Sequence, residues 1–265
     1  MKYKNKLFVI ANKNRKPIDK IVNEGAKEVK SFEEFANKNL DALIMCVTNT
    51  PIAKSISEKI SKVLNSKTLI IDITTHNKTG SMETEQIFKS NNINYIECPV
   101  MGGPGQAEEG ILGGIVGGSD ENFKLSEPYL KMFCKDYFYF GPVGMGAKSK
   151  LLNNFLSLGN AALVNHLAKT ATELGLDLQK VFDVAKLGSG NSAGLIRIFE
   201  SLLKGDFKGF KFTATNSVKD LSYIQDLLKD FPEAEKVAEV NKNYFQKAVD
   251  DGYGESFISE LIEKK

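Results

Sequence analysis

The spacing of apolar and polar positions changes its period near the middle of the chain. In the first half, short apolar runs rich in β-branched residues alternate with stretches of helical periodicity, an order typical of a parallel sheet with crossover helices. The predicted strands are residues 6–11, 42–47, 68–73, 93–97, 111–116 and 136–140. Ser31 and Glu34 form the pattern of a capping box for one short helix, and Pro51 suits the first position of another.

Strand patterns stop after Gly146, and helical periodicity continues almost to the C-terminus. A long apolar stripe over 147–174 ends at Gly175, where a glycine is a common helix stop. Further helices are predicted over 178–187, 193–203, 213–229 and 233–249. The pattern predicts an α/β fold in which a Rossmann-like, doubly wound sheet (1–143) is followed by an all-α domain (144–265).

Composition excludes several classes of protein. The 265 residues carry a formal net charge of +2, without the clustered basic face that marks a nucleic-acid partner. No apolar run is long enough to span a bilayer or to form a signal peptide, so no membrane association is expected. Three isolated cysteines fit neither a disulfide framework nor a zinc site, and they indicate a cytoplasmic protein. His76 and His166 lack paired ligands at metal spacing, so no metal site is predicted.

Lys150 and Asn154 stand out in the run GPVGMGAKSKLLNN, residues 141–154. A spacing of four places the amine and the amide side by side on a helix, directly after a glycine-rich entry, which suggests a reaction centre. A buried lysine amine can have a pKa near neutrality and exchange a proton with a substrate hydroxyl. From context alone, a solvated helix lysine is the favoured interpretation of Lys150, and Asn154 is equally consistent with an asparagine bonded to a neighbouring loop.

Two other kinds of segment could line a ligand. Met101, Gly102 and Gly103 begin a glycine-rich loop whose backbone N–H groups could approach an anion, although the same glycines could form simple turns. Thr48 and Thr75 follow predicted strand ends, where ligands collect in open α/β sheets, or they could be ordinary helix caps.

Six segments, in order from residue 7 to the C-terminus, resemble the β-hydroxyacid dehydrogenases, a family that includes 3-hydroxyisobutyrate dehydrogenase and tartronate semialdehyde reductase. They are LFVIANKN (7–14), CVTNTP (46–51), IDITT (71–75), CPVMGGPGQAEEG (98–110), the Lys150/Asn154 helix, and GDF (205–207) with VKDL (218–221). The resemblance implies a homodimeric enzyme that moves a hydride between NADP, or NAD, and a small hydroxy acid or semialdehyde.

The resemblance also implies roles for individual residues. Lys150 matches the catalytic lysine, and Asn154 with the loop 101–103 would bind the substrate carboxylate. Met101 stands where the family usually has a serine hydroxyl, which a thioether cannot replace as a donor. Val47, Thr48 and Thr75 would line the nicotinamide side of the cofactor, and Lys219 would reach the cofactor from the helical domain. Asp220 is expected to be an orienting or structural carboxylate.

Asn12 and Lys13 match an Asn-Arg pair that follows a strand in the family, and Arg15 and Lys16 add positive charge. No acidic residue stands in this turn to bind a ribose 2′-hydroxyl, which favours NADP over NAD. A solvated basic turn is the alternative.

One family segment has no counterpart. These enzymes open with a strand, a G-x-G-x-x-G turn and a helix, but only six residues precede the strand at Leu7. The resemblance therefore implies an incomplete Rossmann-like sheet, in which two strands would be unpaired or newly joined without that central strand. The alternative function is therefore a non-catalytic or truncated relative that acts as a dimeric binding or structural protein.

Overall fold

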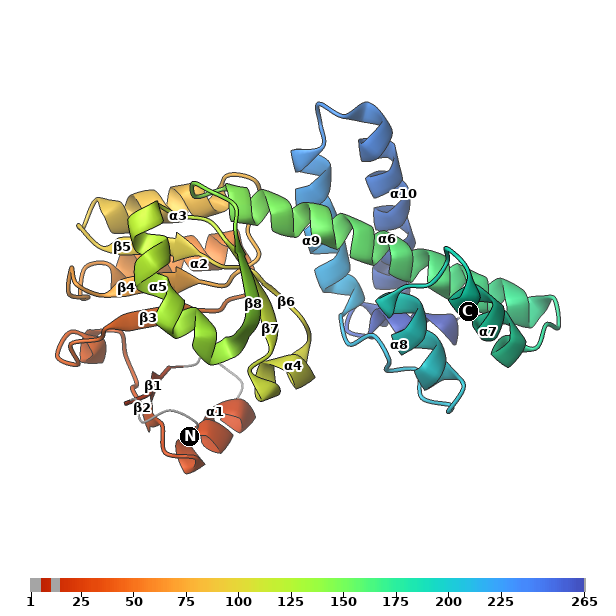
Figure 1. Ribbon diagram of the computed structural model, residues 1–265, viewed down its shortest axis with the longest axis horizontal. Coiled ribbons are helices and arrows are strands. Elements are labelled where there is room, and N and C mark those ends of the chain that lie inside the picture. Colours follow the sequence, from red (N-terminus) through yellow and green to blue (C-terminus); the bar gives the residue numbers. More distant parts are fainter. Residues whose placement is uncertain (1–5, 11–14, 265) are drawn as a thin grey trace. The chain divides into compact units, whose positions relative to one another are not determined.

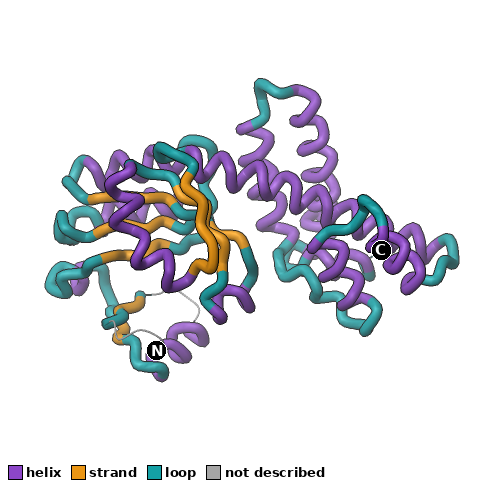
Figure 2. The backbone as a smooth tube through the Cα atoms, in the orientation of Figure 1, coloured by secondary structure: helices purple, strands orange, loops and turns teal. Residues whose placement is uncertain are grey.

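The computed structural model describes residues 6–10 and 15–264, which form two compact units, one ending at Ala147 and one beginning at Lys148. The α/β unit contains strands and connecting helices, and the second unit is helical, which confirms the predicted fold class (Figures 1 and 2). Asn12 and Lys13 lie outside the described residues.

The strands of the α/β unit are β1 Phe8–Val9, β2 Lys27–Glu28, β3 Ala42–Met45, β4 Leu69–Asp72, β5 Asn94–Glu97, β6 Val100–Met101, β7 Leu112–Val116 and β8 Cys134–Tyr139. Its helices are α1 Arg15–Asn23, α2 Thr50–Ile60, α3 Gly80–Lys89, α4 Pro104–Glu109 and α5 Asp120–Phe133, with a 3₁₀ turn at Glu33–Phe35. The two-residue β2 and the short α4 have no counterpart among the predicted elements.

The strands form three hydrogen-bonded groups. β3, β4 and β5 are parallel, and Ile70 of the central strand pairs with Leu43 and Tyr95. β6, β7 and β8 form the second group, in which β6 alone is antiparallel. Reciprocal backbone bonds between Glu97 and Gly117 (2.9 and 3.0 Å) join the second group to β5.

The third group, β1 paired in parallel with β2, stands apart. Within the described residues, β1 pairs with β2 and β3 pairs with β4, and no ladder joins β1 to β3. The sheet is therefore interrupted between β1 and β3, as expected for a doubly wound order without its central strand. Side chains still cross the interruption, because Phe8 and Leu43 pack against the same hydrophobic cluster.

Successive side chains of β4 point to opposite faces of the sheet, so this strand contributes to the hydrophobic core on both faces. Ile70 faces a cluster that includes Ile60 of α2 and Phe88 of α3. Leu69 and Ile71 face the opposite cluster, which includes Leu130 of α5. The strand ends are therefore held by packing from two sides, and loops that follow these ends carry several predicted site residues.

Local helix signals were partly correct. Pro51 lies at the start of α2, which begins one residue earlier, and Asn49 caps it by accepting a bond from Ile52 N at 3.0 Å. The capping box at Ser31 was wrong, because the short helix begins after Phe32, whose side chain does not cap it. Instead, the Glu34 carboxylate accepts a bond from Lys30 N at 3.1 Å.

The second unit is built around α6, Met145–Glu173, whose first three residues belong to the α/β unit. The other helices are α7 Leu178–Leu187, α8 Ala193–Leu202, α9 Ala214–Leu227 and α10 Pro232–Ala248, followed by a π turn at Val249–Tyr253 and a 3₁₀ helix at Ile258–Ile262. One core, with Leu158, Phe199 and Phe245 among its members, holds these helices together. Among the described residues, no helix is both long and apolar enough to cross a membrane.

Candidate active site

Lys150, Asn154, Lys219 and Asp220 form a polar cluster inside the helical unit. Lys150 and Asn154 lie one turn apart on α6, as predicted, and Lys219 and Asp220 lie on α9. Asn154 Nδ2 donates to Asp220 Oδ2 at 2.7 Å, and Lys219 Nζ lies 3.0 Å from Asp220 Oδ1. Asn154 and Asp220 are buried, so the carboxylate fixes the amide orientation and compensates nearby positive charge.

The surroundings of Lys150 lower the pKa of its amine. Burial lowers the pKa of the Lys150 amine from 10.5 to about 8. The Asp220 carboxylate opposes this shift, and the Lys219 ammonium adds to it. An amine with a pKa near neutrality can both donate and accept a proton at physiological pH, which is the property a general acid/base needs.

The cofactor residues predicted in the α/β unit lie at the carboxyl ends of β3 and β4. Val47 N donates to Thr74 Oγ1 at 3.3 Å, so the segments after the two strands are joined. Thr48 is exposed and Thr75 is half-buried on these segments. Neither caps a helix, since α2 is capped by Asn49 and α3 follows Thr79.

A buried network that sequence reasoning did not identify holds the segment around Thr75. Asp72 Oδ2 lies 2.8 Å from His76 Nε2 and accepts a bond from Tyr95 OH at 3.0 Å. His76 Nδ1 lies 3.2 Å from Thr50 Oγ1 at the start of α2. Burial, with the Asp72 charge next, raises the pKa of the Tyr95 hydroxyl well above its ordinary value. The network fixes the β4–α3 connection against α2, so the backbone that carries Thr75 is rigidly placed.

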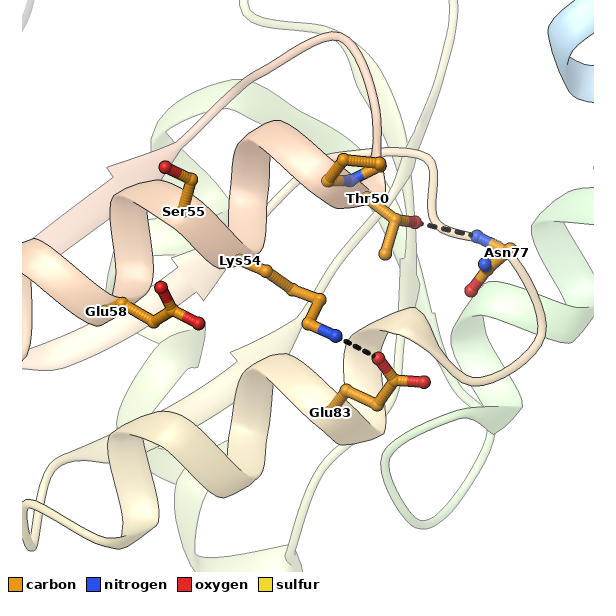
Figure 3. Close-up of a pocket in the computed structure, with 7 residues that line it drawn as sticks. Thr50, Lys54, Ser55, Glu58, Asn77 and Glu83 are labelled. Carbon is orange, nitrogen blue, oxygen red and sulfur yellow. Dashed lines mark hydrogen bonds and ion pairs between the residues drawn. The ribbon is translucent and has the colours of Figure 1, made fainter.

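A polar pocket of about 430 Å³ lies beside this network, between α2 and α3 (Figure 3). Lys54 and Glu83 face each other across it at 2.6 Å, and Asn77 N donates to Thr50 Oγ1 at 3.1 Å. None of the predicted site residues that the structure describes lines it. Because its facing charges already neutralise each other, the pocket offers no evident reaction centre.

The loop predicted to bind a carboxylate begins at β6. Gly102 adopts a φ of 119°, which favours glycine, and Gly103 precedes α4 as its N-cap. Gly103 N donates to Gln106 Oε1 at 2.9 Å. One of the backbone donors proposed for the substrate is therefore engaged by a side chain of the first turn of α4.

The glycine-rich entry to α6 binds a carboxylate of this chain. Glu97 Oε1 accepts bonds from Gly144 N at 2.7 Å and Gly146 N at 2.8 Å. A Cβ on Gly117 would overlap this oxygen, and one on Gly146 would lie 3.0 Å from it. Burial raises the pKa of Glu97 above its ordinary value. These glycines were interpreted as a sign of chemistry, but here they accommodate a buried anion at the start of the helix that carries Lys150.

Positive charge near the N-terminus is partly neutralised. Arg15 contacts Asp19 at 2.8 Å and also pairs with Glu28 of β2. Since both partners are acidic, Arg15 contributes less free charge than the sequence suggested. Among the described residues, no group of three or more His, Cys, Asp or Glu side chains could hold a metal ion.

A nucleotide-binding type of sheet followed by a helical unit that carries a half-buried lysine is the arrangement of a two-domain dehydrogenase. Residues 2–141 match the family model of the NAD binding domain of 6-phosphogluconate dehydrogenase. Residues 144–264 match that of the NAD-binding domain of NADP-dependent 3-hydroxyisobutyrate dehydrogenase. The chain belongs to the β-hydroxyacid dehydrogenase family, and both models agree with the expected NAD(P) cofactor.

Known proteins support this assignment. A probable mitochondrial 3-hydroxyisobutyrate dehydrogenase of Dictyostelium discoideum is 25% identical over 185 residues, which cover 69% of this chain and 57% of that protein. An L-threonate dehydrogenase of Haemophilus influenzae is 25% identical over 250 residues, which cover 92% of this chain and 82% of that protein. The solved structure of 3-hydroxyisobutyrate dehydrogenase from Salmonella typhimurium has the same fold, with a TM-score of 0.86 at 23% identity. The match covers 96% of this chain and 89% of that protein.

Proposed function

We propose that this protein is an NAD(P)-dependent oxidoreductase that interconverts a small hydroxy acid and its semialdehyde or a related carbonyl compound, with Lys150 as general acid/base. The observation that carries the proposal is the half-buried Lys150 beside Asn154 and Asp220, because desolvation lowers the pKa of its amine to about 8. Family membership supports the class of reaction. The bound nicotinamide would accept or supply the hydride.

The cluster suggests how the proton moves. In the oxidative direction, neutral Lys150 accepts the substrate hydroxyl proton, and in reduction its ammonium form returns a proton to the carbonyl oxygen. Asp220 holds one N–H of Asn154, which orients the amide for hydrogen bonding to the substrate. Lys219 is paired with Asp220 and keeps positive charge in the cluster. In this proposal Lys219 also contacts the cofactor.

On the cofactor side, Val47, Thr48 and Thr75 are the proposed nicotinamide contacts, because they follow adjacent parallel strands. Asn12 and Lys13 are the proposed contacts of the cofactor's ribose and 2′-phosphate. NADP is proposed over NAD for this reason, and the description of the family model for residues 144–264 is consistent with it.

A titration with NADPH and NADH, followed by nicotinamide fluorescence, tests the cofactor assignment. We expect saturable binding with a Kd on the order of micromolar for NADPH and weaker binding of NADH, because a lysine favours the 2′-phosphate. Lys13→Ala should weaken NADPH binding while leaving NADH binding unchanged. A folded sample that binds neither nucleotide would contradict the proposed function.

A second candidate function, a non-catalytic dimeric binding or structural protein, is favoured by one observation. Within the part of the chain that the structure describes, no ladder joins β1 to β3, where a doubly wound nucleotide-binding sheet is continuous. Absence of binding in the same titration, together with a stable folded dimer, would favour this candidate.

The proposed homodimer is supported by an exposed stripe on α6. Leu152, Leu156, Leu163 and Leu167 are spaced by four, seven and four residues and so lie along one side of the helix. Leu156 and Leu163 are 74% and 70% exposed, and an aligned row of exposed leucines is unusual on the surface of a monomer. The stripe suggests that α6 packs against a second copy.

Replacing both of these leucines by glutamate should convert the dimer to a monomer, because charge would have to be buried at the interface. Light scattering of wild type and of the double variant Leu156→Glu/Leu163→Glu measures this directly. Val184→Glu, at a residue of α7 that is also 70% exposed but outside the stripe, is the matched control and should stay dimeric. A monomeric wild type would refute the assignment.

A further inference from the structure

Thr75 lies between two anchored neighbours in the connection from β4 to α3. On one side, Thr74 N donates to Asp72 Oδ1 at 2.9 Å, and Val47 N donates to Thr74 Oγ1 at 3.3 Å. On the other side, His76 Nε2 lies 2.8 Å from Asp72 Oδ2. In the described segments 6–10 and 15–264, no hydrogen bond engages the half-buried Thr75 hydroxyl. The neighbours therefore fix the position of this hydroxyl and leave it available to a ligand.

The hydrogen bonds around His76 have one consistent set of donors. Its Nε2 faces the Asp72 carboxylate and therefore carries the ring proton, which leaves Nδ1 as an acceptor. Thr50 Oγ1, 3.2 Å from Nδ1, then donates its hydroxyl proton to the ring. The same oxygen accepts a bond from Asn77 N at 3.1 Å. The donors thus run in one direction, from the Asn77 amide through Thr50 and His76 to Asp72.

This chain of hydrogen bonds is shielded from water. Asp72, His76 and Thr50 are 0%, 1% and 4% exposed. Tyr95 OH also donates to Asp72, so the carboxylate collects bonds from three parts of the α/β unit. Removing one member leaves buried polar groups unsatisfied and loosens the segment that carries Thr75.

We propose that Thr50 and His76 are positioning residues for the nicotinamide half of the cofactor, and that they act through Thr75. The inference rests on the proposed function, in which Thr75 contacts the nicotinamide side. Loss of the Thr50 hydroxyl should weaken binding of that half. Binding of the adenosine half should not change, because the proposed contacts of its 2′-phosphate lie on a different segment of the chain.

The test uses Thr50→Val, which keeps the shape of threonine but lacks the hydroxyl. Its Kd for NADPH, measured by calorimetric titration, should rise about fivefold, the effect of one misaligned hydrogen bond. Its Kd for 2′,5′-ADP, which lacks the nicotinamide half, should stay at the wild-type value. Thr50→Ser restores the hydroxyl and should restore NADPH affinity.

Thr68→Val is the matched control. Thr68 is also buried, and its hydroxyl donates to Leu40 O at 2.8 Å just before β4, at the opposite end of that strand. This variant should lower the free energy of unfolding in urea by an amount similar to Thr50→Val and leave NADPH affinity unchanged. Unchanged NADPH affinity in Thr50→Val, equal losses of NADPH and 2′,5′-ADP affinity, or the same NADPH loss in Thr68→Val would overturn the proposal.

Two further readouts do not depend on the cofactor. Imidazole ¹⁵N spectra of wild type should show a proton on His76 Nε2 and none on Nδ1. Amide hydrogen exchange at Thr74, on the far side of Thr75, should accelerate in Thr50→Val and not in Thr68→Val. A proton on Nδ1, or unchanged exchange at Thr74, would overturn the positioning role.

The outcomes also separate this inference from the proposed function. Absence of NADPH binding by folded wild type would reject the proposed function and the inference together. Normal binding by wild type with any of the contrary results for Thr50→Val or His76 would reject the inference alone.

Discussion

Replacement of Lys150 by alanine is expected to reduce turnover about 10²- to 10⁴-fold, the usual range for loss of a general acid/base. The amine lies beside Asn154 and Asp220, and burial lowers its pKa to about 8. NADPH affinity should change less than about twofold, because the substitution removes the proton carrier and not a proposed nucleotide contact. Steady-state kinetics and a nucleotide titration on the same sample measure both quantities.

Lys148→Ala is the matched control, since it removes a half-buried lysine from the same helix two residues earlier. Its turnover should remain close to wild type. The pH profile gives a second readout: reduction needs the ammonium form of Lys150 and should fall as pH rises through about 8, whereas oxidation should rise. Retained turnover in Lys150→Ala, or profiles without opposite slopes near pH 8, would reject the catalytic role.

Replacement of Glu97 by alanine should lower the free energy of unfolding of the α/β unit by about 2–4 kcal/mol. The substitution leaves Gly144 N and Gly146 N without their acceptor and opens a cavity beside Gly117. Urea unfolding at pH 7, monitored by circular dichroism, measures the loss. Glu58→Ala, which removes an exposed carboxylate of α2, should change stability by less than about 0.5 kcal/mol.

The difference in unfolding free energy between wild type and Glu97→Ala should depend on pH in a defined direction. Burial raises the folded-state pKa of Glu97 above its ordinary 4.5, so the folded state holds this proton more tightly than the unfolded chain. The associated stability is fully present below pH 4.5 and is lost as pH rises through the folded-state pKa. Wild type should therefore exceed Glu97→Ala by more at pH 4.5 than at pH 8. A stability difference between wild type and Glu97→Ala that grows with pH would contradict the assignment of Glu97 as a buried carboxyl with a raised pKa.

The sequence predicted the fold well where hydrophobic periodicity was strong. The buried strand Leu69–Asp72 lies within the predicted range, and the 29-residue helix Met145–Glu173 begins two residues before its predicted start, because burial of their apolar faces decides their conformation. The helix Pro104–Glu109 was missed. Its two flanking glycines and internal glycine predict a turn, and the Gln106 bond to Gly103 stabilises its first turn instead.

Site residues were predictable only where spacing along one element brings them together. Lys150 and Asn154 met that condition. Asp220 accepts a bond from Asn154 across 66 residues of sequence, and Glu97 reaches Gly144 across 47, so no local pattern reveals either pair. The glycine-rich run before Lys150 was interpreted as the entry to a reaction centre, but its backbone N–H groups bind the Glu97 carboxylate of the same chain.

The interruption between β1 and β3 also affects how the α/β unit unfolds. β4 has hydrogen-bonded neighbours on both sides, whereas β1 and β2 share one two-residue ladder. Cooperativity between that pair and the rest of the sheet is carried by side chains such as Phe8 and not by backbone bonds. The β1–β2 pair can therefore open locally at a lower free energy than β4, which makes it a separate, less protected cooperative unit of an otherwise continuous core.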